Sequence, residues 1–398
     1  MKFRAKSIAL LTALAITSVS LYGCGEKEQA PEETPVKQEQ TAEEKDTEEK
    51  SNTAETVEIT DHAGRTVEIP APEKLEKVYF TSPAGMIFAY TMNPEKMAGS
   101  SIELTEDEAK YLPDLAALPS LGGIQIGSEL NKEEIISSGA QIILQVGTSK
   151  IKDSDISDAD ELQDQLDIPV VVVTGLFEEM DMTYELLGEI YGEEERAAEL
   201  ASYAKEIISD VEEKLSDLSE DEKVRVYYAQ GPEGLETEPA SSERSTILKY
   251  AQANNVAEVD AKEVKGRSPV SMEQVLEWNP ELIISSSDSR SGTYSHIKED
   301  PVWQEIKAVQ DGEVYQTPEL PFSWMDRPPS VNRVLGLQWL ANLLYPEKYD
   351  IDIAENTKEF CSKFYNVELT DEDVSYILEG AVRGDSSDSP SKTESQEQ

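Results

Sequence analysis

The chain has 398 residues and a formal net charge of −46 at pH 7, from 35 Lys and Arg against 81 Asp and Glu. This acidic excess disfavours nucleic acid or anionic lipid as a partner, because few cations are present to neutralise phosphates. High charge also serves solubility, so it identifies no partner by itself.

The N-terminus has the pattern of an export signal. Basic residues precede an apolar run over residues 8–19, which is too short for an ordinary transmembrane helix, and Leu-Tyr-Gly-Cys follows, ending at Cys24. This pattern resembles a bacterial lipoprotein signal. The resemblance implies a signal peptide over residues 1–23, lipidation of Cys24, and anchoring on the extracytoplasmic face of a bacterial cell membrane. The alternative is an ordinary secretory signal with a chance cysteine.

Two polar tails flank the part of the chain that can fold. Residues 24–56 and 384–398 have few apolar side chains, so they are expected to form a disordered acidic linker and a disordered acidic tail. The roughly 325 residues between them are enough for two domains. Besides Cys24 the chain has only Cys361, which excludes an internal disulfide in the lipidated protein.

The first predicted lobe covers residues 57–181. Strands are expected over residues 57–61, 66–69, 78–80, 141–146 and 169–174, with a hairpin turn at residues 62–65 and a helix from about Met86. Strands separated by helices predict a parallel sheet.

A helical segment follows over residues 182–218. Apolar residues recur at three- and four-residue steps, and Gly192 and Glu193 interrupt them, which predicts a shorter helix and then a long one. The long helix, from Glu193 to Leu215, would measure roughly 35 Å, so it could bridge two lobes.

The second predicted lobe covers residues 219–383. Strands are expected over residues 224–228, 282–285 and 313–315, and helices over residues 245–254, 331–344, 353–364 and 371–377. The predicted fold class is therefore α/β, with two similar α/β lobes joined by a single long helix and a ligand cleft between them.

A short internal repeat supports two related lobes. Residues 131–143 and 271–283 each predict a helix with a glutamate near its start, a helix breaker and an apolar strand. Glu133 and Glu273 hold the same place in the two copies, as expected for a duplicated lobe.

Several segments, in order, resemble one protein family. Residues 59–70 (Ile-Thr-Asp-His-Ala-Gly-Arg-Thr-Val-Glu-Ile-Pro) are similar to the opening of periplasmic binding proteins for iron-siderophores, haem and cobalamin, which serve ABC importers. The other matching segments are residues 82–84, both copies of the repeat, and residues 300–303, 324–330 and 344–346. No single segment is diagnostic, but the ordered set is specific and extends to Asp350.

The resemblance implies a role for the repeated glutamates. In this family one surface glutamate of each lobe docks onto arginines of the two permease subunits, and the matching positions here are Glu133 and Glu273. Two such contacts fix orientation more than they add affinity. The alternative is that each glutamate only favours a helix N-terminus, and both roles are compatible.

Ligands of open α/β sheets bind beyond the carboxyl ends of the strands, so the loops that follow strands hold the candidate ligand residues. Ser82 and Pro83 follow the strand at residues 78–80, and residues 145–148 end another. An ordinary turn is the alternative for each of them.

Trp324 and Arg327 lie in a proline-framed loop that could present them rigidly. Trp324 could stack on a planar chelate, and Arg327 could bind carboxylate or catecholate oxygens. Alternatively, Trp324 packs under the helix that begins near Val331, and Arg327 pairs with Asp326 or with a helix cap.

Arg244 precedes a predicted helix N-terminus and could add positive charge, although Ser245 alone could cap that helix and leave Arg244 solvated. Arg267 and Arg290 are less well placed. The small number of clustered cations argues against a catecholate ligand.

Only two histidines occur, His62 in the hairpin turn and His296 in a predicted polar loop. A receptor for a free transition metal needs several His and carboxylate ligands, so no metal site within the protein is predicted and a chelated metal fits better. His296 or Tyr294 as an axial ligand to haem iron is an alternative.

These patterns together favour a non-enzymatic, lipid-anchored solute receptor. We expect a monomer without an intrinsic cofactor that binds a metal chelate, ferric siderophore first, and delivers it to a permease dimer. Cobalamin, haem and a nickel chelate stay open as ligands. A hydrolase lacks support because no Gly-x-Ser-x-Gly, His-Glu-x-x-His or glycine-rich phosphate motif occurs, and an adhesin or sensor is the third class.

Overall fold

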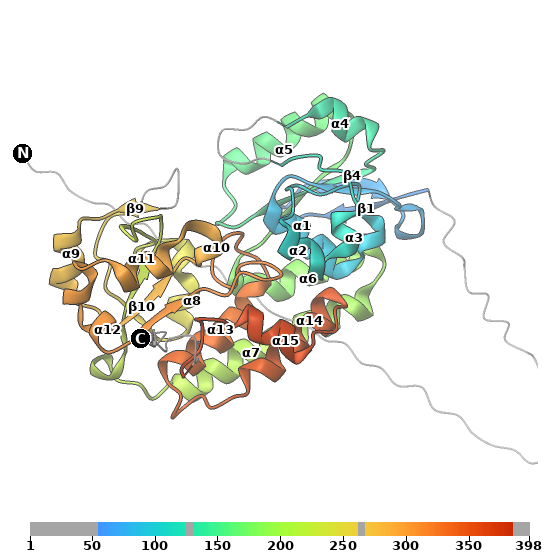
Figure 1. Ribbon diagram of the computed structural model, residues 1–398. Helices are drawn as coiled ribbons and strands as arrows, with labels where there is room; N and C mark the ends of the chain where they lie inside the picture. The colour runs from blue at the N-terminus through green and yellow to red at the C-terminus, as the bar shows by residue number, and fades with distance from the viewer. Residues whose placement is uncertain (1–54, 124–129, 262–266, 385–398) are drawn as a thin grey trace, which may run out of the picture. The chain divides into compact units, whose positions relative to one another are not determined.

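A computed structural model describes residues 55–123, 130–261 and 267–384 (Figure 1). The predicted signal peptide and Cys24 lie outside the described residues, as do nearly all of the predicted linker and tail. Within the described part of the chain, no helix has the length and apolar character that a membrane crossing requires.

The N-terminal lobe is built on a three-stranded parallel sheet in the order β3-β4-β5. Its strands are β3 (Val78–Phe80), β4 (Ile142–Gly147) and β5 (Val170–Thr174), preceded by an antiparallel hairpin of β1 (Thr56–Thr60) and β2 (Thr66–Pro70). The helices of this lobe are α1 (Pro83–Met92), α2 (Glu106–Tyr111), α3 (Pro113–Ala116), α4 (Lys132–Ser137) and α5 (Asp153–Leu166). Every residue of β3 and β5 is buried, as expected for parallel strands covered on both faces.

The turn between β1 and β2 ties the hairpin to β5. Asp61 is 3% exposed and accepts hydrogen bonds from Arg65 Nε (2.9 Å) and from the backbone N–H of Val172 (3.1 Å). The Nδ1 atom of His62 accepts the backbone N–H of Thr174 (2.9 Å), and burial lowers the pKa of His62. The Asp-His-Ala-Gly-Arg segment therefore has a structural role in this lobe.

Two helices carry the chain out of the N-terminal lobe. α6 (Met180–Tyr191) ends at Gly192, whose φ of 67° is the left-handed conformation that suits glycine at a helix C-terminus. α7 (Glu194–Leu215) has 22 residues and spans about 33 Å. Its buried stripe runs from Ala197 to Leu215, which confirms the predicted short and long helices.

The C-terminal lobe holds a four-stranded parallel sheet in the order β11-β10-β6-β8. Its strands are β6 (Arg225–Ala229), β8 (Asn254–Asn255), β10 (Leu282–Ser285) and β11 (Val314–Gln316), and a small antiparallel pair is formed by β7 (Glu236–Thr237) and β9 (Ser268–Pro269). Its helices are α8 (Thr246–Tyr250), α9 (Met272–Trp278), α10 (Asp288–Ser291), α11 (Thr293–Glu299) and α12 (Lys307–Gln310). Both lobes are α/β, as predicted.

Two local predictions in this lobe were wrong. The helix expected over residues 245–254 ends at Tyr250, and Gln252, at φ 55°, turns the chain into the edge strand β8. Asparagine is a poor strand former, so β8 could not be predicted from the sequence. His296 lies in α11 and not in a loop.

The last three helices pack along the bridge and against the N-terminal lobe. α13 (Asn332–Leu344), α14 (Ile353–Tyr365) and α15 (Asp371–Ile377) follow one another, and Figure 1 shows α13 and α14 beside α7. The ring centroids of Tyr203 in α7 and Phe364 in α14 are 5.6 Å apart, and those of Tyr90 in α1 and Tyr365 are 6.1 Å apart. The only other cysteine, Cys361, is free and buried in α14.

Residues 371–383 form a C-terminal clasp that contacts both lobes. In α15, Asp373 pairs with Lys110 of α2 at 2.6 Å, and the Tyr376 hydroxyl donates to Asp107 at 2.9 Å. The chain then returns to the edge of β11, where Gln316 N–H donates to the Gly380 carbonyl (2.9 Å). The clasp thus adds a second connection between the lobes besides α7.

Close packing in α13 makes one glycine necessary. A Cβ added at Gly336 would lie 2.0 Å from the Trp324 carbonyl oxygen, which is backbone and cannot rotate away. We predict that Gly336→Ala destabilises the protein by about 1–3 kcal/mol, measured by denaturant unfolding. In the comparison variant Gly85→Ala, the new Cβ meets the Val146 side chain at 2.9 Å, which can shift, so its loss should be smaller. A gain of stability in Gly336→Ala, as helix propensity alone predicts, would contradict this packing.

Candidate functional site

The carboxyl edge of the N-terminal sheet is shaped by Ser82. Its hydroxyl caps α1 by accepting the Gly85 N–H (3.2 Å) and donates to the Val146 carbonyl (3.2 Å). Pro83 is the first residue of α1 and is partly exposed, as is Ser82. Both therefore lie where β3 and β4 end, as predicted, although the hydroxyl of Ser82 already serves the backbone.

The carboxyl edge of the C-terminal sheet holds a buried polar network around Asp326. This carboxylate is 1% exposed and accepts the hydroxyl of Tyr228 at 2.7 Å. The Gln230 amide lies 3.4 Å from both of its oxygens, and Gln230 Oε1 has no hydrogen-bond partner. Tyr228 and Gln230 come from the end of β6 and the residue after it, so the network marks the strand edge at which ligands of α/β sheets bind.

Arg327 joins this network through two carboxylates. Its Nη2 donates to Glu238 Oε1 at 2.8 Å, and its Nε lies 3.3 Å from Asp326 Oδ2 without a hydrogen bond. The pairing with Asp326 is the alternative that the sequence offered. Both acids are nearly fully buried, so the Arg327 guanidinium is held between two carboxyl groups of the protein.

Trp324 lies in the core. It is 1% exposed, its indole N–H donates to the Leu320 carbonyl (3.1 Å), and its ring meets that of Trp339 in α13 edge to face at 6.4 Å. The indole is therefore unavailable for stacking on a ligand in this conformation. Trp324 instead supports the loop that carries Arg327. Packing was the alternative to ligand stacking for this residue.

Arg244 is partly buried in the short 3-10 helix Glu243–Ser245. Ser242 is the N-cap of this 3-10 helix and accepts the Arg244 N–H at 3.2 Å, whereas Ser245 is the N-cap of α8, as predicted, although its side chain makes no capping hydrogen bond. Among the described residues no carboxylate lies within 4.0 Å of the Arg244 side chain. By contrast, Arg267 pairs with Glu236 (3.1 Å) and Arg290 pairs with Glu319 (2.7 Å).

The structure adds three ionisable residues that sequence reasoning missed: Glu238, Glu319 and Arg333. Burial, and then the charge of Asp326, raises the pKa of Glu238 to about 7. Burial also raises the pKa of Glu319 to about 7, against the opposing effect of Arg290. Arg333 could have been noticed in the sequence, because it is a charged residue in a helix that has almost no polar face.

Arg333 stands at the start of α13 and reaches the N-terminal lobe. It is 3% exposed, its Nη2 donates to the Gly175 carbonyl at 3.4 Å, and its guanidinium lies 5.2 Å from the centre of the Phe177 ring. Its Nε has no hydrogen-bond partner, and burial lowers its pKa to about 10. Gly175 directly follows β5, so Arg333 belongs to the same strand edge as Ser82.

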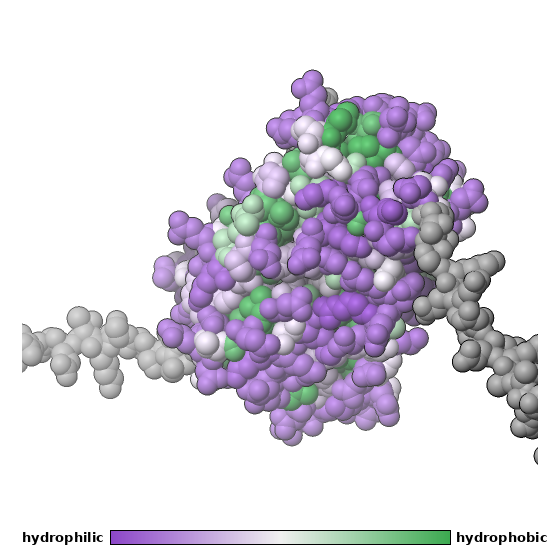
Figure 2. Space-filling view, turned by 90° about the vertical axis from the view of Figure 1, so that its right-hand side faces the viewer, coloured by the Kyte–Doolittle hydropathy of each residue, from purple (hydrophilic) through white to green (hydrophobic). Residues whose placement is uncertain are grey.

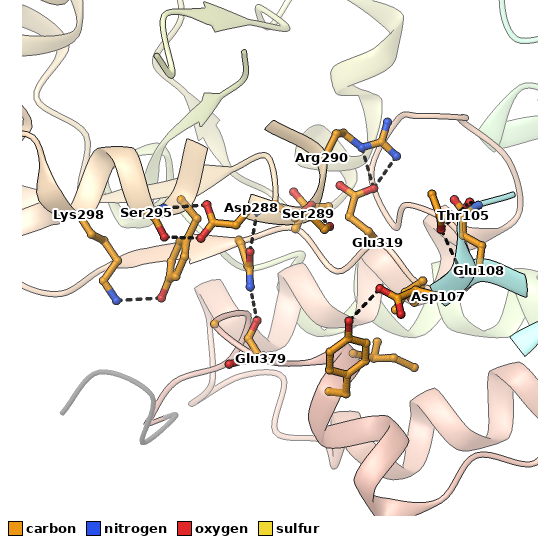
Figure 3. Close-up of a pocket in the computed structure, with 18 of the residues that line it drawn as sticks. Thr105, Asp107, Glu108, Asp288, Ser289, Arg290, Ser295, Lys298, Glu319 and Glu379 are labelled. Atoms are coloured by element: carbon orange, nitrogen blue, oxygen red, sulfur yellow. Dashed lines mark hydrogen bonds and ion pairs between the residues drawn. The ribbon is translucent and has the colours of Figure 1, made fainter. Parts of the chain in front are cut away.

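A separate cavity of about 1070 Å³ lies beside α2, α10 and α15 (Figure 3). Its lining includes six acidic residues, Asp107, Glu108, Asp288, Glu299, Glu319 and Glu379, and two basic ones, Arg290 and Lys298. Of the candidate ligand residues, Arg290 and Tyr294 line this cavity, whereas the following do not: Ser82, Pro83, Arg244, Trp324 and Arg327. Within the described chain, no group of three or more His, Cys, Asp or Glu residues is placed to hold a metal ion.

Glu133 and Glu273 occupy equivalent exposed places. Each lies in the first helical turn, of α4 and α9 respectively, behind a side-chain N-cap at Asn131 and Ser271. Both helices end in the left-handed conformation, at Gly139 and Asn279. In the described part of the chain neither glutamate has an ion pair.

Comparison with known proteins decides the family. Residues 149–320 match the model of a family described as periplasmic binding protein. A solute-binding protein of an ABC transporter from Sulfurospirillum deleyianum has the same fold with a TM-score of 0.73 and 28% identity, over 81% of this chain and 98% of that one. Residues 149–320 are therefore a domain of the periplasmic binding protein family, and the chain shares the fold of an ABC transporter solute-binding protein. Its two α/β lobes give it the class III fold, and members of this family are transport components, not enzymes.

Two curated relatives extend the comparison. The molybdate-binding protein MolA of Haemophilus influenzae is 33% identical over 185 residues, which are 46% of this chain and 50% of MolA. YvrC of Bacillus subtilis, a substrate-binding lipoprotein of an ABC transporter, is 22% identical over 86% of this chain and 99% of its own. The alignment with MolA therefore spans half of that relative.

The raised pKa values of Glu238 and Glu319 predict how stability depends on pH. Each folded carboxyl keeps its proton up to about pH 7, whereas the unfolded one loses it near 4.5, so the free energy of unfolding should fall as pH rises from about 5 to about 8. Glu238→Gln and Glu319→Gln should each flatten this fall in thermal unfolding across that range. The exposed Glu233→Gln should keep the wild-type profile, and an unchanged slope in both buried variants would contradict the prediction.

Proposed function

We propose that this chain is an extracytoplasmic solute-binding protein that captures a small metal-containing solute between its lobes and delivers it to an ABC importer. The observation that carries this proposal is the pair Glu133 and Glu273, exposed on equivalent helices of two lobes joined by α7. A two-fold permease offers two equivalent docking points, and the duplicated lobes present one acid to each.

The exposed surface supports docking by charge. Figure 2 shows a face on which hydrophilic side chains predominate and hydrophobic ones form small separate patches. Among the described residues the exposed large hydrophobic side chains are Ile136, Met182, Val302 and Tyr376, which are isolated from one another in the sequence. This protein offers a permease no broad apolar surface to bury, so charge must orient the two proteins as they dock. We assign this role to Glu133 and Glu273.

We place the solute at the facing strand edges, near Ser82 and Pro83 of one lobe and Arg244 and Arg327 of the other. The first candidate is a metal chelate such as a ferric siderophore, with cobalamin, haem or a nickel chelate as alternatives. MolA binds molybdate, which adds a metal oxyanion to these candidates. The tethering lipid would be carried by Cys24, and YvrC, a lipoprotein, supports this anchoring.

The docking role can be separated from solute binding by a double variant. Glu133→Ala with Glu273→Ala should abolish solute uptake by cells while solute binding by the purified protein stays unchanged, because both side chains are exposed on helices outside the strand edges. The matched control is Glu134→Ala with Glu277→Ala, which removes the same charge from the same two helices and should leave uptake intact. Equal loss of uptake in the two double variants would refute specific docking, and full uptake in the first would refute docking altogether.

A further inference from the structure

The C-terminal clasp (residues 371–383) is bonded firmly to the C-terminal lobe. The indole N–H of Trp339 in α13 donates to the Ala381 carbonyl at 2.7 Å, and this bond is buried. The side-chain amide of Gln316, the last residue of β11, donates to the Glu379 carbonyl at 2.7 Å. Because both bonds hold the backbone of the clasp, this end of it moves with the C-terminal sheet.

The contact of the clasp with α2 in the N-terminal lobe is made by exposed side chains. The Lys110 side chain is 58% exposed where it pairs with Asp373 at 2.6 Å. Tyr376, whose hydroxyl donates to Asp107 at 2.9 Å, is 48% exposed. Solvated contacts of this kind contribute little to stability, because water competes for both partners. We call these two contacts the α2–α15 latch.

Like charges oppose the α2–α15 latch. Both helices carry three acidic residues in the first turn, so negative charge gathers on each side of the contact. Lys110 is the one basic residue among residues 101–123. Its hydrogen bond to Asp373 holds the pKa of that carboxyl well below its usual range, so the pair stays charged. One lysine and one hydroxyl therefore hold two acidic helices together.

The α2–α15 latch also borders the cavity of about 1070 Å³. Asp107 and Tyr376 both line this cavity, and Figure 3 shows Asp107 there with its hydrogen bond dashed. Another part of the lining comes from Asp288 and Lys298, in α10 and α11 of the C-terminal lobe. The cavity is thus bounded by both lobes, with α15 across one side of it.

We propose that the α2–α15 latch is a releasable strap between the lobes. Closed, it holds α2 against the clasp and covers one side of the cavity. Released, it lets the lobes part on that side while α7 keeps them connected. The inference concerns the movement of the lobes and does not rest on the proposed solute or importer.

The two ends of the clasp distinguish a strap from a permanent tie. The bond from Trp339 to the clasp backbone is buried, as a permanent tie requires, whereas the bonds from Lys110 and Tyr376 are solvated and opposed by like charge. When two arrangements of the lobes differ little in free energy, a contact of this size changes their populations measurably. Release should therefore occur at α2, with the clasp still bonded to the C-terminal lobe.

Spin labels on the two lobes test this proposal. Labels at Glu134→Cys in α4 and Glu277→Cys in α9, both exposed, report the separation of the lobes by double electron–electron resonance. The mature chain carries Cys24→Ser for this purpose, and Cys361 is buried, so labelling is confined to the introduced cysteines.

The latch variant combines Lys110→Met, which removes the charge, with Tyr376→Phe, which removes only the hydroxyl. It should broaden the distance distribution and raise the population outside the wild-type distance about 3-fold or more. The matched control combines Lys358→Met and Tyr315→Phe. Lys358 pairs with Asp371 of α15 from α14 (2.6 Å), and the Tyr315 hydroxyl donates within the C-terminal lobe, so this control should keep the wild-type distribution.

Thermal unfolding of the same variants completes the test. The melting temperature of the latch variant should stay within about 2 °C of the wild type, because the contacts it loses are solvated. A larger fall would mark the contact as a permanent tie and overturn the proposal. A wild-type distance distribution in the latch variant, or equal broadening in the control, would overturn it as well.

Discussion

Charged side chains are removed from water where the two lobes meet. The proposed function depends on how these buried charges are paired. Asp326 and Glu238 are satisfied by Arg327, and Tyr228 and Ser242 take up their remaining oxygens. This network fixes the loop between β11 and α13 on the C-terminal sheet. Arg333, six residues after Arg327, is buried, and its Nε has no hydrogen-bond partner.

The connections between the lobes determine how far they can move. α7 crosses once, while α13, α14 and the C-terminal clasp hold both lobes from the other end of the chain. Two such connections restrict a wide hinge and allow small closures over a bound solute. A nearly rigid receptor would keep Glu133 and Glu273 at a constant separation, as the docking that we propose for them requires.

Much of the architecture could be predicted from the sequence, because it rests on local patterns. The apolar runs of β3, β4 and β5, the periodicity of α7 and the duplicated helix-and-breaker segments predicted two α/β lobes and a bridge. β8 was missed because Asn254 and Asn255 become a strand only through pairing with β6. The polar network was missed because its members, such as Glu238 and Asp326, are brought together by tertiary folding, which no sequence spacing reveals.

We propose that the two lobes enclose a small metal-containing solute. Native mass spectrometry with metal analysis, on protein purified from its own host, tests this most directly. We expect one metal per chain, released with a chelator or as an oxyanion, and chemically unaltered by the protein. Release of a bare metal cation, or of a solute that the protein has converted, would contradict it.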